Sequence, residues 1–130
     1  KGGINMLIIE GKSGKSRKLK EILNQIIKEH LLDENKSIYM FDAVKINFEM
    51  EKVIHYCHLG KDYNILLDWS KISLSKYIDD GIIVFEYNVP FEMKGEFIKM
   101  ARFWEAESYI DEVIMTIQNN NLDEIKVYKI

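Results

Sequence analysis

The chain opens with a short apolar segment, a glycine-containing turn and a segment of helical periodicity, in that order. Residues 6–10 form a nearly continuous apolar run, the pattern of a β-strand that is covered on both faces. From residue 15 to about residue 30, the apolar side chains recur at helical spacing: Leu19, Ile22, Leu23, Ile26 and Ile27. A buried strand that leads directly into an amphipathic helix is typical of parallel α/β folds.

The rest of the chain continues this alternation. We expect further strands at residues 38–41, 63–69, 81–89 and 124–130, and helices at residues 48–60, 74–78 and 97–117. Strands that alternate with helices at this spacing favour right-handed parallel connections. We therefore predict an α/β fold, a three-layer sandwich around a mainly parallel five-stranded sheet.

Composition limits the class of protein. With 130 residues, of which 47% are hydrophobic, the chain can form one domain (1–130) with a sizeable core. We interpret residues 1–5 as a non-native remnant. A lone cysteine and the lack of a leader or long apolar stretch favour a cytoplasmic protein without membrane contact. A net charge of −3 argues against a protein that coats nucleic acid.

Gly14, Lys15 and Ser16 form a triplet at the junction between the first strand and the first helix. Such a turn presents backbone N–H groups and the positive end of the helix dipole to an anion. Further basic side chains lie close by, and we expect Lys15 to be exposed when no ligand is bound. The sequence therefore predicts a site for a phosphate-bearing ligand, formed by Gly11, Lys12, Ser13, Gly14, Lys15 and Ser16.

The triplet resembles the core of the Walker A motif of P-loop NTPases. The resemblance implies that Lys15 contacts phosphate, that Ser16 coordinates Mg²⁺, that the ligand is ATP or GTP, and that any activity is NTPase-like or kinase-like. The full motif places a glycine where this chain has Ile9, and Gly11 comes two residues later. Losing about two backbone donors costs roughly 3–6 kcal/mol, so we expect weakened triphosphate binding.

P-loop proteins also end a buried strand with an aspartate that supports Mg²⁺, and the resemblance assigns this role to Asp68. Trp69 follows it, so the activating glutamate of many ATPases is missing at that position. Glu86 and Asn88, at the end of the expected strand 81–89, are candidates for a polarising or sensing group. The expected Mg²⁺ ligands are thus Ser16 and Asp68, and Asn88 joins the nucleotide-binding set. No catalytic base can be named.

The same turn also resembles the phosphate loop of flavodoxins, through Ser13, Gly14 and Ser16. That resemblance implies FMN binding. Gly11 departs from the flavodoxin pattern, and no flavin-stacking loop follows the later strands. FMN is therefore kept as a minor alternative.

A third interpretation belongs to a different class, a non-catalytic interaction or oligomerisation module with a degenerate phosphate loop. Phe97, Ala101 and Trp104 form a second apolar stripe beside the expected core face of the helix at 97–117. We expect this stripe to form a homodimer contact. His55, Cys57 and His58 are too few and too local to predict a metal site.

Overall fold

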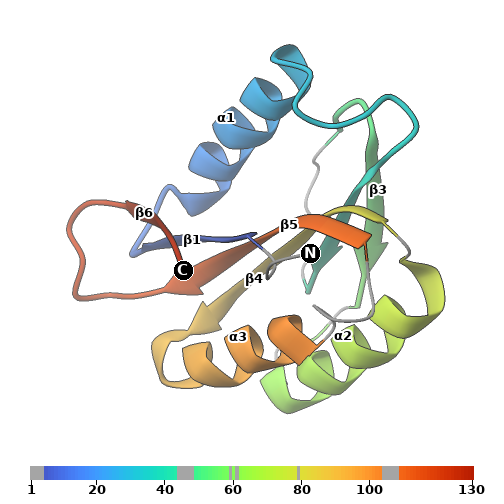
Figure 1. The fold of residues 1–130 in the computed structure, drawn as a ribbon. Coiled ribbons are helices and arrows are strands. Elements are labelled where there is room, and N and C mark those ends of the chain that lie inside the picture. The colour runs from blue at the N-terminus through green and yellow to red at the C-terminus, as the bar shows by residue number, and fades with distance from the viewer. Residues whose placement is uncertain (1–4, 44–48, 59, 61, 79, 104–108) are drawn as a thin grey trace.

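A computed structural model describes residues 5–43, 49–58, 60, 62–78, 80–103 and 109–130 (Figure 1). Helices and strands alternate along most of this part of the chain. In chain order they are β1 (Asn5–Gly11), α1 (Lys15–Lys28), β2 (Ile38–Asp42), β3 (Val53–Cys57), α2 (Tyr63–Tyr77), β4 (Asp80–Pro90), the 3-10 turn η1 (Phe91–Met93), α3 (Lys94–Phe103), β5 (Tyr109–Gln118) and β6 (Lys126–Lys129).

All these strands belong to one six-stranded sheet in the order β3-β2-β4-β5-β1-β6. Every pairing is parallel except that of β6 with β1, which is antiparallel. Helix α1 lies on one face of the sheet, and α2 and α3 lie on the other (Figure 1). The α/β class and the mainly parallel sheet are confirmed, whereas the expected strand count of five is wrong.

Alternating side chains of the central strands form a separate core on each face of the sheet. In β1, Leu7 and Ile9 pack with the buried face of α1, while Met6 and Ile8 pack on the side of α2 and α3. The run at 6–10 is therefore a strand buried on both faces, as its sequence indicates. The strand starts at Asn5, which lies opposite Glu112 in β5, so this residue belongs to the sheet.

Helix α1 starts and stops at residues with left-handed backbone. Gly14 precedes its first turn with φ of 82°. At the other end, His30 has φ of 52°, and the N–H groups of His30 and Leu31 donate to the carbonyl oxygens of Ile27 and Ile26. This hydrogen-bond pattern is the Schellman motif, which ends the helix and usually places glycine at the left-handed position.

The strand expected at 63–69 is wrong, because these residues form the first half of α2. The Asp62 side chain caps the helix by accepting hydrogen bonds from the N–H groups of Asn64 and Ile65. Its buried positions Leu66, Ser70 and Ser73 recur at helical spacing. The helix expected at 74–78 is thus the end of a longer one.

Two other expected helices are also wrong. Within residues 48–60, the structure has strand β3, which pairs with β2 at the edge of the sheet. The described residues within 97–117 belong to the end of α3 and to strand β5, which lies between β4 and β1. The apolar residues of β5 are buried on both faces, and this mimics the spacing of a helix. The last strand was expected correctly and is β6.

The apolar stripe expected to form a dimer contact faces the core. Phe97 is 0% exposed and packs edge-on against the rings of Tyr63 and Tyr87, and Ala101 is buried beside it. Trp104 lies outside the described residues. The prediction of an association surface is wrong for Phe97 and Ala101, because their face of α3 covers the sheet. None of the described helices is long and apolar enough to cross a membrane.

Candidate functional site

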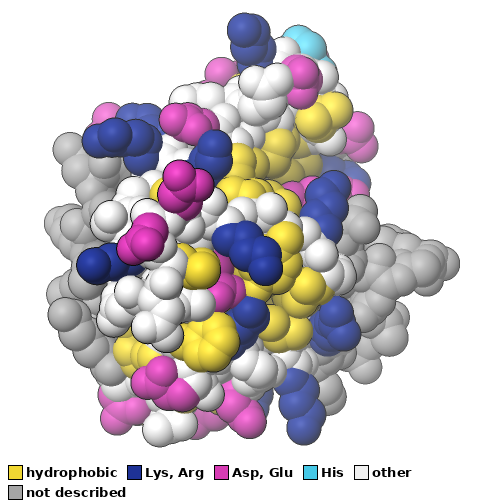
Figure 2. Space-filling model, turned by 90° about the vertical axis from the view of Figure 1, so that its left-hand side faces the viewer, with side chains coloured by type: hydrophobic (Ala, Val, Ile, Leu, Met, Phe, Trp, Pro, Cys, Tyr) yellow, Lys and Arg dark blue, Asp and Glu magenta, His cyan; other side chains and the backbone are white. Residues whose placement is uncertain are grey.

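The carboxyl ends of β1, β4 and β5 point to the same side of the molecule, beside the first turn of α1 (Figure 1). Figure 2 faces this side, where basic side chains are interspersed with acidic and hydrophobic ones across the described surface. Ligands of parallel α/β sheets collect at this edge. The polar groups that the fold gathers at this edge are therefore the candidates for a binding site.

Both glycines of the turn have a structural requirement. The left-handed backbone of Gly14 disfavours any side chain. A Cβ on Gly11 or Gly14 would lie 3.3 or 3.2 Å from side-chain atoms of Ile125, which packs on the turn. The glycines thus let the segment before β6 approach the turn closely.

Lys15 is buried, contrary to the expectation of an exposed lysine. Its side chain lies under the turn with 5% exposure, and Nζ donates to Gln118 Oε1 over 2.8 Å and to the carbonyl oxygen of Lys12 over 3.5 Å. Burial lowers the pKa of Lys15, and the nearby charge of Glu86 opposes that change. The ammonium group is held at the end of the sheet.

Glu86 lies where the pairing of β4 with β2 ends, on the side of α1, and it is 2% exposed. Oε1 accepts a hydrogen bond from Thr116 Oγ1 at 2.9 Å, and Ser16 also donates to this carboxylate. Burial raises the pKa of Glu86 to about 7 despite the hydrogen bonds and the charge of Lys15. Oε2 has no hydrogen-bond partner among the described residues.

Asp42 ends β2 directly beside Glu86, since the two residues are opposite each other in the β2–β4 pairing. It is 0% exposed, and its Oδ2 is hydrogen-bonded to Nε2 of His55 from β3. Oδ1 is buried and lacks a partner within the described part of the chain. The α1 side of the sheet therefore carries two adjacent carboxylates. Each has one open oxygen, by which we mean a buried oxygen without a hydrogen-bond partner among the described residues. Asp42 was not among the predicted site residues, although it directly follows an apolar run.

Asp68 is not part of this arrangement. It is exposed on α2, which covers the opposite face of the sheet from α1. Its expected position at a strand end, beside Ser16, is therefore wrong, and it cannot share a cation with Ser16.

Asn88 does lie at the expected edge, where β4 is irregular in its pairing with β5. Its backbone is left-handed with φ of 48°, and its N–H donates to Thr116 Oγ1 at 3.0 Å. Strained backbone and strand bulges of this kind recur beside binding sites, where they redirect the chain. Asn88 and Glu86 are thus joined through the same threonine hydroxyl.

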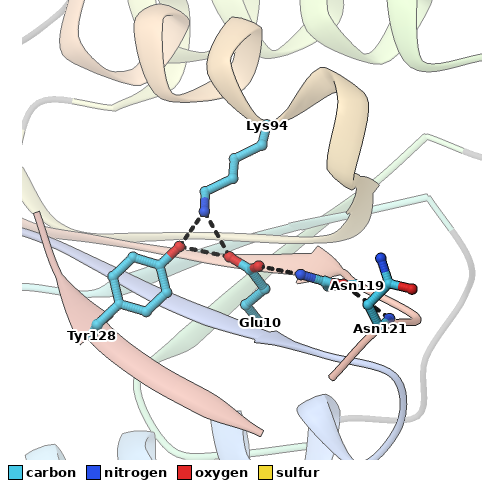
Figure 3. A network of polar contacts seen from close by, with 5 residues as sticks. All are labelled: Glu10, Lys94, Asn119, Asn121 and Tyr128. Atoms are coloured by element: carbon cyan, nitrogen blue, oxygen red, sulfur yellow. Dashed lines mark hydrogen bonds and ion pairs between the residues drawn. The ribbon is translucent and has the colours of Figure 1, made fainter. Parts of the chain in front are cut away.

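A second polar network lies on the other face of the same edge (Figure 3). Glu10 Oε1 accepts hydrogen bonds from Lys94 Nζ at 2.7 Å and from Tyr128 OH at 2.6 Å, and Oε2 accepts from Asn119 Nδ2 at 2.7 Å. Burial alone would raise the pKa of Glu10, but these hydrogen bonds outweigh it and lower the pKa. The network joins β1, α3 and β6 and leaves no open oxygen on Glu10.

A pocket of about 430 Å³ borders the outer side of the turn. Its walls come from the turn and α1 on one side and from the segment before β6 on the other, and include Ser13, Gly14, Arg17, Asp123, Glu124 and Ile125. The volume is within the range of small-molecule sites. The pocket is contiguous with the turn because it shares Ser13 and Gly14 with it.

Within the described residues, no group of three or more His, Cys, Asp or Glu side chains is arranged to hold a metal ion. A cation at Asp42 and Glu86 would therefore need oxygen ligands from elsewhere. Mg²⁺ is commonly bound in this way, by one or two carboxylates together with substrate phosphates and water.

Comparisons with protein-family models, with curated proteins and with solved structures found no match to this chain.

Proposed function

We propose that this domain binds the phosphate of a nucleotide, together with Mg²⁺, at the turn formed by residues 11–16. The observation that carries the proposal is the open oxygen of buried Glu86 beside Ser16 and Lys15. A carboxylate in such a position has a desolvation cost that a bound cation would offset. Phosphoryl transfer or hydrolysis is the reaction class that the arrangement would serve.

Three kinds of group lie around Glu86. The start of α1 supplies backbone N–H groups and a positive dipole, Lys15 supplies an ammonium group, and Asp42 and Glu86 supply carboxylate oxygens. An anion alone would be repelled by the two carboxylates, and a cation alone would be repelled by the lysine. A phosphate bound with Mg²⁺ satisfies both sets of charges.

The residues present fit Mg²⁺ without Asp68. Ser16, Glu86 and Asp42 would hold it, and the hydrogen bond from His55 would orient the Asp42 carboxylate. When bound, Mg²⁺ would neutralise phosphate charge and polarise a phosphoryl oxygen. Lys15 binds and orients the same phosphate, while Thr116 fixes one oxygen of Glu86.

The pocket beside the turn favours a nucleotide over inorganic phosphate. A ligand with its phosphate on Gly14 would extend into this space, where Asp123 and Glu124 can accept hydrogen bonds from hydroxyl or amino groups. Ile125 offers an apolar surface to a ring.

The test is ligand-dependent thermal stability, with ATP, GTP, FMN and inorganic phosphate, each with and without Mg²⁺. Ligand at ~100 times its dissociation constant stabilises the native state by about 2.7 kcal/mol, which a melting curve resolves. We expect stabilisation by ATP or GTP that depends on Mg²⁺ and is lost in Lys15→Met, a variant that keeps the buried aliphatic stem. Lys20→Ala, on the exposed side of α1, is the charge-matched control and should respond as the parent does. Stabilisation by FMN alone, or by no ligand, would contradict the proposal.

A further inference from the structure

The side chain of Gln118, the last residue of β5, contacts the turn at residues 11–16. Its Oε1 accepts the hydrogen bond from Lys15 Nζ, and its Nε2 donates to the carbonyl oxygen of Lys12 at 2.9 Å. One amide thus bridges two residues of the turn. The lysine that should meet phosphate is held by a neutral protein acceptor.

The next residue fastens the connection between β5 and β6 to β1. The N–H of Asn119 donates to the carbonyl oxygen of Gly11 at 2.9 Å, and its side chain donates to Glu10. Figure 3 shows Asn119 beside Glu10, with Lys94 and Tyr128 on the other side of that carboxylate. Two consecutive residues therefore link the phosphate turn to the network at the start of α3.

We infer that Gln118 is a latch, which competes with phosphate for Lys15 and is displaced when the ligand binds. This inference rests on the proposed function. The bond from the Lys15 ammonium to Gln118 has a neutral acceptor, whereas a phosphate oxygen adds the attraction of a full negative charge, so phosphate replaces the amide oxygen on the ammonium group. Displacement also removes one of the contacts that hold the β5–β6 connection against the turn. Binding at Lys15 is thereby coupled to the position of the segment that contains Asn119.

Two substitutions at this position separate a latch from a structural support. Gln118→Leu removes both the acceptor and the donor, whereas Gln118→Glu gives Lys15 a charged and stronger acceptor. In calorimetric titrations with Mg²⁺–ATP and with Mg²⁺–pyrophosphate, we expect Gln118→Leu to bind about tenfold or more tightly than the parent. Gln118→Glu should bind more weakly by a similar factor.

Asn120→Ala is the matched control. It removes the 2.7 Å hydrogen bond between Gln118 Nε2 and Asn120 Oδ1 but leaves the contact with Lys15 in place. Its affinity should stay within about twofold of the parent. Weaker or unchanged binding by a folded Gln118→Leu variant would overturn the latch and make Gln118 a support of the turn.

A second measurement needs no ligand. The rate at which an acylating reagent modifies Lys15, followed by mass spectrometry, should rise in Gln118→Leu, fall in Gln118→Glu and stay unchanged in Asn120→Ala. Equal rates in all variants would overturn the latch whatever the titrations show. If the rates follow the expected order while no variant binds either ligand, the proposed function fails and the displacement step fails with it, but the contact between Gln118 and Lys15 stands.

Discussion

Replacing Glu86 with glutamine should make the protein more stable at alkaline pH. The pKa of this carboxyl changes from 4.5 in the unfolded chain to about 7 in the folded one, mainly because burial disfavours the charged form. The folded state therefore holds a proton that the unfolded state has lost, and stability falls as pH rises between these two values. The difference corresponds to about 3 kcal/mol.

The magnitude can be read from paired urea unfolding curves of the parent and Glu86→Gln at pH 5, 6, 7 and 8, with a chelator present to exclude cations. Groups far from Glu86 titrate equally in both proteins and cancel, so the difference between the two reports Glu86 together with the charges coupled to it. We expect the variant to gain roughly 2–3 kcal/mol on the parent between pH 5 and pH 8, with most of the change complete near pH 7, because part of the total effect lies below pH 5. A difference that is independent of pH would refute the assignment of a buried, protonated Glu86.

Three further predictions concern the scaffold, each read from equilibrium unfolding. His30→Gly should stabilise the protein by roughly 0.5–1 kcal/mol, because His30 holds the left-handed position that ends α1; a loss of stability would contradict this reading. Gly81→Ala should destabilise it by several kcal/mol, because Gly81 has φ of 96° and a Cβ would clash with the carbonyl oxygen of Ser37; its control, Gly95→Ala in α3, would meet no described atom and should be neutral or mildly stabilising. Phe97→Ala should lower the free energy of unfolding by about 3–5 kcal/mol, because Phe97 is buried in the core. A loss under about 1 kcal/mol would contradict this burial.

The elements that were predicted correctly are those whose structure follows from the pattern of apolar residues within the element itself. The run at 6–10 can only be satisfied by burial on both faces, and α1 has one apolar face that a single neighbour covers. In both, the local pattern and the tertiary environment agree.

Strand β5 and helix α2 fail for opposite reasons. Four apolar residues of β5 are spaced as on one helix face, but they lie in a central strand between β4 and β1 whose two faces are both covered: Ile110, Val113, Ile114 and Ile117. In α2 the apolar run at 65–67 looks like a strand, and only the cap at Asp62 and the buried serine Ser70 indicate a helix. The neighbouring strands decide the structure of β5, and the cap and the packing of one helix face decide that of α2. Hydrophobic periodicity contains neither kind of information.

In the candidate site too, residues that are adjacent in sequence could be predicted, whereas residues that strand pairing brings together could not. The turn and Lys15 follow from adjacent residues and could be placed from the sequence, although their ligand stays a prediction. Asp42 and Glu86 become neighbours only because β2 pairs with β4 across a long stretch of chain. Asp68 was predicted to end a strand, but it lies on helix α2, which covers the face of the sheet opposite α1. The error in the predicted site therefore follows from the error in the predicted strand.

The most direct test of the central claim is to locate ligand binding residue by residue, by following backbone amide signals in NMR spectra during a titration with Mg²⁺–ATP. We expect the largest shifts at the N–H groups of Gly14, Lys15 and Ser16, with a second set at residues 118–121 and none around Asp68 on α2. Saturable shifts that leave the turn unchanged, or an absence of shifts at millimolar ligand, would contradict the claim.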